Sequence, residues 1–159
     1  MSKIKVITDS TSYITKEYAE ENDITVIQLN YTFDGETQIE GHPGEFNDFF
    51  DKLSKSKSFP NTSQPAVGSF VEAYEKALIN YDEILVLPFS SKLSGTYNSA
   101  CMAKKMVDEN RIKVVDTLQA VGNLKFLIED AVEMIKKGFK IDEIVQSING
   151  QKKRMEIYL

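Results

Sequence analysis

Cysteine and histidine are nearly absent from this sequence, which contains one residue of each and no tryptophan. A lone thiol cannot form an internal disulfide, and this favours a reducing, cytoplasmic location. Because Cys101 and His42 leave only carboxylates as further ligands, we predict no metal site and no other cofactor. Cys101 lies among apolar neighbours, so we expect a buried structural thiol.

Long apolar runs and an excess of positive charge are missing as well. No run approaches the roughly 20 apolar residues that a membrane span needs. The net charge of −5 argues against nucleic acid or an anionic membrane as the main partner. With 159 residues, of which 42% are hydrophobic, the chain suits one globular domain with a core.

Common signatures of enzymes are also missing. The sequence has no Walker pattern, no G-x-G-x-x-G and no G-x-S-x-G nucleophile elbow. A serine hydrolase would have to use His42, whose His-Pro-Gly turn is typical of a solvated loop residue. Asp9 and Asp116 could in principle bind a metal, but no further carboxylates stand near them in sequence.

Apolar segments of strand length alternate with segments of helical periodicity. Strands are predicted at residues 4–7, 24–29, 84–87 and 112–115, and a hairpin at 31–41 that turns at Asp34-Gly35. Helices are predicted at 15–21, 70–78, 97–107, 124–135 and 141–148, and a further stripe is formed by Phe46, Phe49, Phe50 and Leu53. Residues 54–69 are predicted to be irregular. Asn149-Gly150 are predicted to end the last helix, and the tail at residues 152–159 is predicted to start a strand. The order indicates an α/β fold with a mostly parallel sheet, helices on both faces and a small hairpin insertion.

A hydroxyl-rich loop follows the strand at 84–87 and precedes the helix at 97–107. It contains Ser90, Ser91, Ser94, Gly95 and Thr96. Free N–H groups and the helix dipole favour an anion at such a helix start, and Gly95 would allow the backbone to approach a ligand closely. The competing interpretation is that Ser94 or Thr96 only caps the helix.

Polar side chains follow three of the predicted strands. IKVITDST at 4–11, VLPFSS at 86–91 and IKVVDTLQ at 112–119 each place an Asp, Ser or Thr after an apolar run. Because ligands gather at the carboxyl ends of parallel strands, these side chains point to a binding edge. Helix capping explains many such residues on its own, so this pattern does not prove a site.

The hydroxyls suit a ligand carboxylate or phosphate. Each hydrogen bond to an ionised acceptor contributes about 1.5–3 kcal/mol. Hydroxyls alone therefore give weak affinity, and tight binding would need apolar surface as well.

Four stretches resemble the DegV family of bacterial fatty-acid-binding proteins. They are IKVITDST, NTSQP at 61–65, SSKLSGTYNSA at 90–100 and, more loosely, VVDTLQAVGNL at 114–124. Their order and spacing fit the family along the whole chain. Ala66-Val67 depart from it, because family members often carry another hydroxyl and a proline there, which leaves the cap of the next helix undefined.

The resemblance implies a protein that buries one long-chain fatty acid and is not itself an enzyme. By analogy Thr62 and Ser94 hydrogen-bond the carboxylate, and Ser63, Gly95, Thr96 and Ser10 complete the candidate ligand-binding set. Burial of the acyl chain, worth about 0.8 kcal/mol per methylene, would supply the affinity that the hydroxyls lack. Characterised members present the loaded protein to a fatty acid kinase in phospholipid synthesis, so a fatty acid kinase is the expected partner.

Family members continue into a second domain that closes the acyl tunnel. We therefore assign residues 1–150 to the first domain and 151–159 to the start of a connection, and we expect a fragment. Such a chain alone should bind fatty acid poorly and expose an apolar surface.

Two other functions remain open at this point. One is a small-anion or nucleotide-binding α/β protein without acyl specificity, and the other is a hydrolase that uses Ser94 or Asp9. Acyl chain length, saturation and oligomeric state are not encoded in any pattern we can identify.

Overall fold

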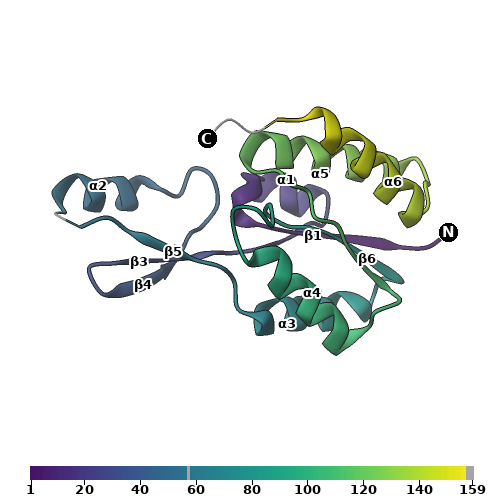
Figure 1. Cartoon of the computed structure of the whole chain (residues 1–159), viewed down its shortest axis with the longest axis horizontal. Helices are drawn as coiled ribbons and strands as arrows, with labels where there is room; N and C mark the ends of the chain where they lie inside the picture. Colours follow the sequence, from purple (N-terminus) through teal and green to yellow (C-terminus); the bar gives the residue numbers. More distant parts are fainter. Residues whose placement is uncertain (57, 157–159) are drawn as a thin grey trace.

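A parallel sheet forms the centre of the structure, a computed structural model that describes residues 1–56 and 58–156. Its strands are β1 (Ile4–Asp9), β2 (Thr25–Ile27), β6 (Glu83–Leu87) and β7 (Ile112–Val114). The spatial order is β2-β1-β6-β7, and every neighbouring pair is parallel. The predicted α/β fold with a mostly parallel sheet is confirmed (Figure 1).

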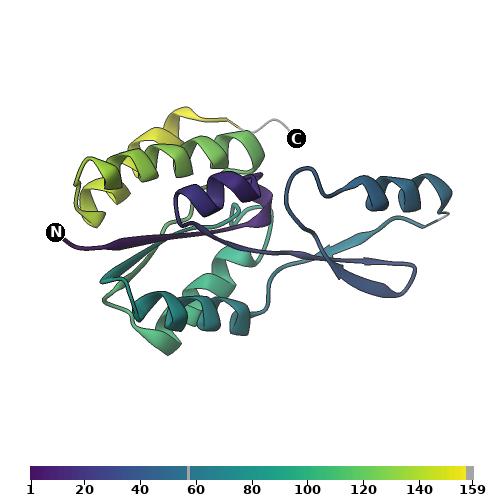
Figure 2. The same ribbon diagram turned by 180° about the vertical axis from the view of Figure 1, so that it is seen from behind.

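Helices cover both faces of this sheet, as Figures 1 and 2 show from opposite sides. One layer consists of α1 (Lys16–Glu21), α5 (Val121–Lys136) and α6 (Ile141–Gln151), and the other of α3 (Val67–Leu78) and α4 (Thr96–Val107). Successive residues of β6 point to opposite faces. Leu85 and Leu87 therefore pack in the core under α5 and α6, whereas Ile84 and Val86 pack under α3 and α4.

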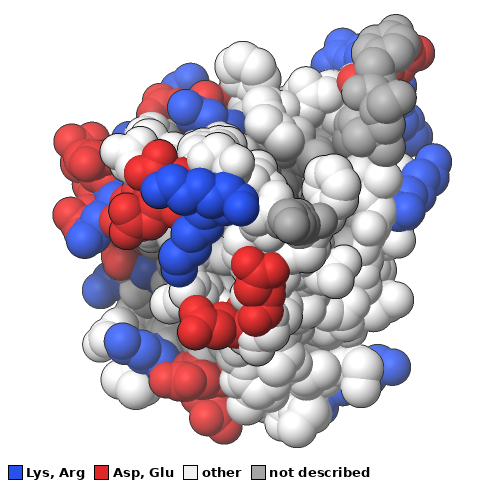
Figure 3. Space-filling view, turned by 90° about the vertical axis from the view of Figure 1, so that its left-hand side faces the viewer, with Lys and Arg blue, Asp and Glu red and all other residues white. Residues whose placement is uncertain are grey.

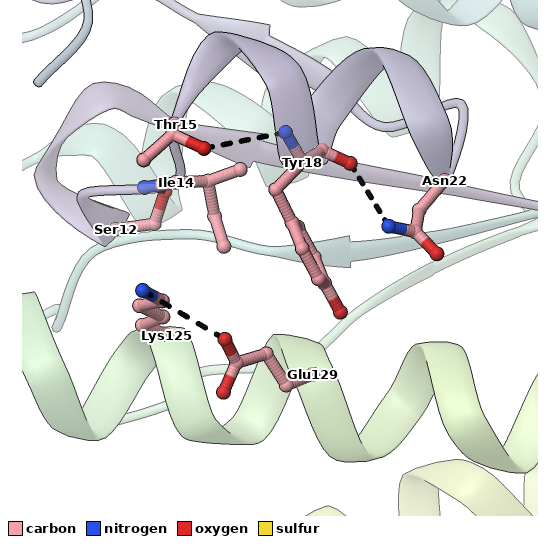
Figure 4. Close-up of polar contacts among 7 residues, drawn as sticks. All are labelled: Ser12, Ile14, Thr15, Tyr18, Asn22, Lys125 and Glu129. Carbon is pink, nitrogen blue, oxygen red and sulfur yellow. Dashed lines mark hydrogen bonds and ion pairs between the residues drawn. The ribbon is translucent and has the colours of Figure 1, made fainter.

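The short helix α1 is fixed by its cap and by one aromatic side chain. Thr15 Oγ1 accepts a hydrogen bond from the backbone N–H of Tyr18 at 3.2 Å, which satisfies a free donor of the first turn. The Tyr18 ring extends from α1 towards α5, next to Glu129 (Figure 4). Burial, followed by the charges of Glu129 and Glu133, raises the pKa of Tyr18.

A smaller unit, which we call the extension, comprises residues 30–63 and projects beyond the carboxyl ends of the parallel strands (Figure 1). It contains β3 (Asn30–Phe33), β4 (Glu36–Ile39), α2 (Asn47–Lys55) and β5 (Asn61–Ser63), with an antiparallel sheet in the order β4-β3-β5. The predicted hairpin turn is confirmed, since Asp34 and Gly35 have φ angles of 49° and 85°.

Three local predictions were wrong. Residues 54–69 contain β5, which carries no apolar alternation and forms through pairing with β3, a contact between distant parts of the chain. Helix α6 runs through Asn149 and Gly150 to Gln151, three residues beyond its last buried side chain, Ile148. Residues Lys152–Arg154 form a 3-10 turn, not a strand; the final residues 157–159 lie outside the described part of the chain.

The helices were also compared with the length and hydropathy that a bilayer requires. Within residues 1–56 and 58–156, no helix is long and apolar enough to cross a membrane.

Candidate functional site

Two carboxylates at strand ends hold the hydroxyl-rich loop that follows β6. Asp9, the last residue of β1, accepts a hydrogen bond from the backbone N–H of Phe89 at 2.7 Å. Asp116, just beyond β7, accepts one from the N–H of Ser91 at 3.1 Å. Because β1 and β7 flank β6, the loop is fastened from both sides at the carboxyl edge of the sheet. The predicted convergence of three strand ends is confirmed, and the two aspartates shape the loop.

Asp9 is fully buried, and its oxygens are occupied by protein donors. Besides the Phe89 N–H, it accepts bonds from the Thr11 N–H at 3.0 Å and the Thr11 hydroxyl at 2.6 Å. Burial is the main influence and raises the pKa of Asp9 above its usual value of 3.8, although these hydrogen bonds act in the opposite direction.

This pKa shift predicts a pH-dependent contribution to stability. An acid whose pKa rises on folding binds more protons in the native state, so its contribution to stability is complete below the unfolded value and is lost as pH rises through the folded value. Replacement of Asp9 by Asn removes the titration. We expect the difference in unfolding free energy, wild type minus Asp9→Asn, to decline as pH rises from about 3.8. Urea unfolding of both proteins across this range tests it, and a constant difference would contradict the assignment.

Ser94 lies in this loop, and its hydroxyl is paired with Thr96. Its Oγ accepts the backbone N–H of Thr96 at 3.2 Å and lies 2.9 Å from the Thr96 hydroxyl, which is itself fully buried. If Thr96 donates in that pair, the Ser94 proton remains available for an anion. The N-cap of α4 is Gly95, which has no side chain to offer, and the Ser94 Oγ satisfies the N–H of Thr96 at the start of the helix. Ser94 therefore has a capping role, which leaves its second lone pair and its proton for other partners.

Gly95 leaves room for the side chain of Gln64. A Cβ built on this glycine would lie 1.9 Å from Gln64 Oε1, so a side-chain amide occupies the space beside it. Gln64 follows β5 directly and belongs to the NTSQP stretch. The contact therefore brings the end of the extension next to the Ser94 loop.

Thr62 and Ser63 are exposed on β5, where successive side chains point to opposite faces. Thr62 pairs with Tyr31 of β3 and borders a small cavity. Ser63 pairs with Asn30 and does not border this cavity. The strand geometry thus separates two candidates that sequence alone could not rank.

The cavity beside Thr62 has a volume of about 120 Å³ and mostly apolar walls. Its lining is Tyr13, Asn30, Tyr31, Glu40, Phe46, Phe49, Phe50, Pro60 and Thr62. The predicted stripe of Phe46, Phe49, Phe50 and Leu53 belongs to α2 and its N-terminal flank. No residue of α2 is fully buried, and the three phenylalanines line this cavity. The sequence shows that this stripe is aromatic, but it does not show which residues the stripe packs against.

Ser10 is the candidate whose hydroxyl is already engaged. It is buried, donates to Glu40 Oε2 at 2.5 Å and accepts the Leu29 N–H at 2.9 Å. In this arrangement its proton is used inside the protein, where it ties the loop after β1 to the base of the extension.

Exposed apolar side chains and unusual backbone angles accompany the strand ends. Tyr13, Leu93 and Val121 are 43%, 39% and 50% exposed and follow β1, β6 and β7 respectively. Tyr13, Leu118 and Val121 have φ angles of 54°, 55° and 48°, which are costly for residues other than glycine and are frequent at functional sites. Seen from the extension (Figure 3), charged residues gather towards the left of the view, and a broad area right of centre carries few.

The side chains considered for catalysis are engaged elsewhere. The His42 ring is partly buried between the Ile14 carbonyl at 3.2 Å and Gln28 at 3.3 Å, so it is not the solvated loop residue predicted. Cys101 is partly exposed rather than buried. The side-chain hydrogen bond between Cys101 and Tyr97 is the main cause that raises the pKa of Tyr97 to about 12. Over the described ranges, no three His, Cys, Asp or Glu side chains cluster as a metal site would require.

The sequence and the fold were compared with those of known proteins. A family model described as "Uncharacterised protein, DegV family" matches residues 3–159. The chain belongs to the DegV family. The motifs that suggested the family from sequence, NTSQP and SSKLSGTYNSA, are the segments that Gln64 and Gly95 bring into contact.

Relatives of this DegV-family chain agree in sequence and structure. It is 36% identical over its whole length to a DegV domain-containing protein of Staphylococcus aureus (strain N315), of which it covers 56%. It matches a Thermotoga maritima protein, whose structure was described as revealing a fatty acid binding function, with a TM-score of 0.89, 38% identity and coverage of 96% of this chain and 56% of that one. It matches the fatty acid binding protein DegV of Bacillus subtilis with a TM-score of 0.89, 34% identity and coverage of 96% and 55%. The chain thus spans about half the length of these relatives.

Proposed function

We propose that this domain forms part of a long-chain fatty acid site in which the Thr62 and Ser94 hydroxyls bind the carboxylate. The observation that carries the proposal is the position of Thr62, at the border of an aromatic cavity and two residues before the glutamine that contacts the Ser94 loop. A hydroxyl beside an apolar wall suits a ligand with a polar head and an apolar chain. The fatty acid binding reported for the related proteins supports the same ligand class.

The size of the cavity indicates how much of the ligand this domain accommodates. Sites for small molecules usually enclose about 300–1,000 Å³, whereas this cavity has about 120 Å³. It can take only a part of a long acyl chain, so further walls would be needed. The exposed Tyr13, Leu93 and Val121 at the same edge of the sheet offer apolar surface for such a closure.

Lipid analysis of the purified protein tests this function. We expect extraction of the full protein that the gene encodes to release free fatty acids with chains of about 14–18 carbons, the length whose burial gives useful affinity. Mass spectrometry of the extract distinguishes these acids from nucleotides or small anions, which would support the alternative function. An extract without fatty acid, together with no binding of added palmitate, would refute the proposal.

We also propose that the loaded protein is a carrier subunit that presents its fatty acid to a cytoplasmic fatty acid kinase. The resemblance of NTSQP and SSKLSGTYNSA to the motifs of characterised carriers supports this role. Among the described residues, Ser94 has a hydroxyl and a backbone N–H as neighbours rather than a general base, which fits binding better than hydrolysis. We expect a fatty acid kinase to form acyl-phosphate from ATP and fatty acid only when this protein is present. An assay of acyl-phosphate formation with and without the protein measures this dependence.

A further inference from the structure

The side chain of Gln64 connects two parts of the protein that belong to different sheets. Thr62 stands on β5 of the extension, whereas Ser94 stands in the loop after β6 of the parallel sheet. Two hydroxyls can bind one carboxylate only if their separation is fixed to within a fraction of an ångström. The relative position of the extension and the loop therefore decides whether Thr62 and Ser94 act together.

Gln64 makes two contacts across this junction. Its Nε2 donates a hydrogen bond of 3.2 Å to Ser99 Oγ in α4. Its Oε1 lies where a side chain on Gly95 would begin, so the amide rests directly on the start of α4. Ser99 is itself fixed, since it is 3% exposed and its N–H donates to the Gly95 carbonyl at 3.0 Å.

The surroundings of Gln64 argue against a purely structural role. The residue as a whole is exposed, so its contacts remove little apolar surface from water and contribute little to the stability of the core. The core beneath is formed by Phe70, Tyr74 and Ala100, which are fully buried and pack without it. The amide instead joins the residue after β5 to the start of α4, next to the Ser94 loop.

We propose that Gln64 is a positioning residue that sets the Thr62 hydroxyl relative to the Ser94 hydroxyl, so that both donate to one ligand carboxylate. This inference rests on the proposed function. Gly95 is needed for this positioning, because any side chain there would displace the Gln64 amide. The requirement for glycine at the start of α4 thus comes from a neighbouring side chain and not from the backbone angle, since Gly95 has an ordinary φ of −75°.

The test compares palmitate with hexadecanol, which has the same chain length but no carboxylate. In the full protein, Gln64→Ala should weaken palmitate binding about tenfold, the value of roughly one hydrogen bond, and leave hexadecanol binding unchanged. Gly95→Ala should have a similar effect, because it displaces the Gln64 amide without altering either hydroxyl. Gln146→Ala, which removes an exposed glutamine side chain from α6, is the matched control and should change neither affinity.

A double-mutant cycle isolates the coupling between the two residues. If Gln64 is the group that Gly95 accommodates, the double variant should bind palmitate no worse than either single variant. Additive losses would overturn the inference, as would an unchanged palmitate-to-hexadecanol ratio in Gln64→Ala. Thermal unfolding of each variant shows whether the fold is retained, and Ser99→Ala, which removes the hydrogen-bond acceptor, provides a second measurement if Gly95→Ala does not fold.

The outcomes also separate this inference from the function on which it rests. If Thr62→Ala and Ser94→Ala lower palmitate affinity but Gln64→Ala does not, the fatty acid site stands and Gln64 has no positioning role. If none of the hydroxyl variants lowers palmitate affinity, the carboxylate site itself is wrong.

Discussion

Replacing Thr62 and Ser94 together by alanine is expected to weaken fatty acid binding by about a hundredfold or more. Each hydroxyl that donates to an ionised carboxylate contributes about 1.5–3 kcal/mol, and 1.4 kcal/mol corresponds to a factor of ten. Thr62 is exposed on β5, and Ser94 is only partly buried in its loop, so neither replacement opens a cavity in the core. Titration of the full protein with palmitate measures the loss. Thermal unfolding should show only a modest decrease, which comes from Ser94→Ala leaving the Thr96 hydroxyl and N–H without their acceptor.

Two comparisons sharpen this result. Ser69→Ala removes an exposed hydroxyl from the first turn of α3 and serves as a control that should bind palmitate normally. Ser63→Ala tests the strand geometry, because Ser63 points to the face of β5 opposite Thr62 and should lose far less affinity. A larger loss for Ser63→Ala than for Thr62→Ala would show that the site lies on the other face. A large fall in the melting temperature of Ser94→Ala would instead favour a structural role for this hydroxyl.

Phe49→Ala is expected to loosen the extension while the parallel sheet stays folded. The Phe49 ring contacts Tyr31 edge-on at 5.1 Å and lies 6.4 Å from Phe33 and 5.5 Å from Phe50, measured between ring centroids. Because Tyr31 and Phe33 belong to β3, the Phe49 ring links α2 to that strand. Phe→Ala in a core costs about 3–5 kcal/mol, so we expect about 2–4 kcal/mol for this half-buried ring.

Hydrogen exchange resolves this effect by segment. Amides of α2, β3 and β5 should lose protection in Phe49→Ala, and those of β1 and β6 should keep theirs. Phe59→Ala is the matched control, because Phe59 is 89% exposed and its removal should leave all segments unchanged. Equal loss of protection in both units would mean that the extension does not open separately. Weaker palmitate binding by Phe49→Ala would add support for an acyl path along the aromatic cavity.

The main elements of the fold followed from sequence because their signals are local. The strands β1 and β6 are apolar runs of strand length, and α3 and α5 show helical stripes that face the core. The helix α4 was predicted as an element, but it buries Thr96, Ser99, Ala100 and Ala103, a mostly small and polar face. The strand β5 carries only Asn, Thr and Ser, and its pairing with β3 depends on residues some 30 positions away. No pattern within residues 54–69 encodes that pairing, which is why the prediction there was wrong.

The amino-acid sequence by itself determined the α/β class, the DegV family and the strand-end loops with their hydroxyls. Apolar periodicity and the NTSQP and SSKLSGTYNSA motifs are properties of consecutive residues, so they can be recognised without coordinates. The tertiary structure decided which partners the hydroxyls have, because Ser10 is bonded to Glu40 and Leu29 while Ser94 pairs with Thr96. It also assigned Gly95 to Gln64, a contact between residues 31 positions apart. Such pairings arise only where the base of the extension meets the carboxyl edge of the parallel sheet, because that junction brings together segments that no local pattern relates.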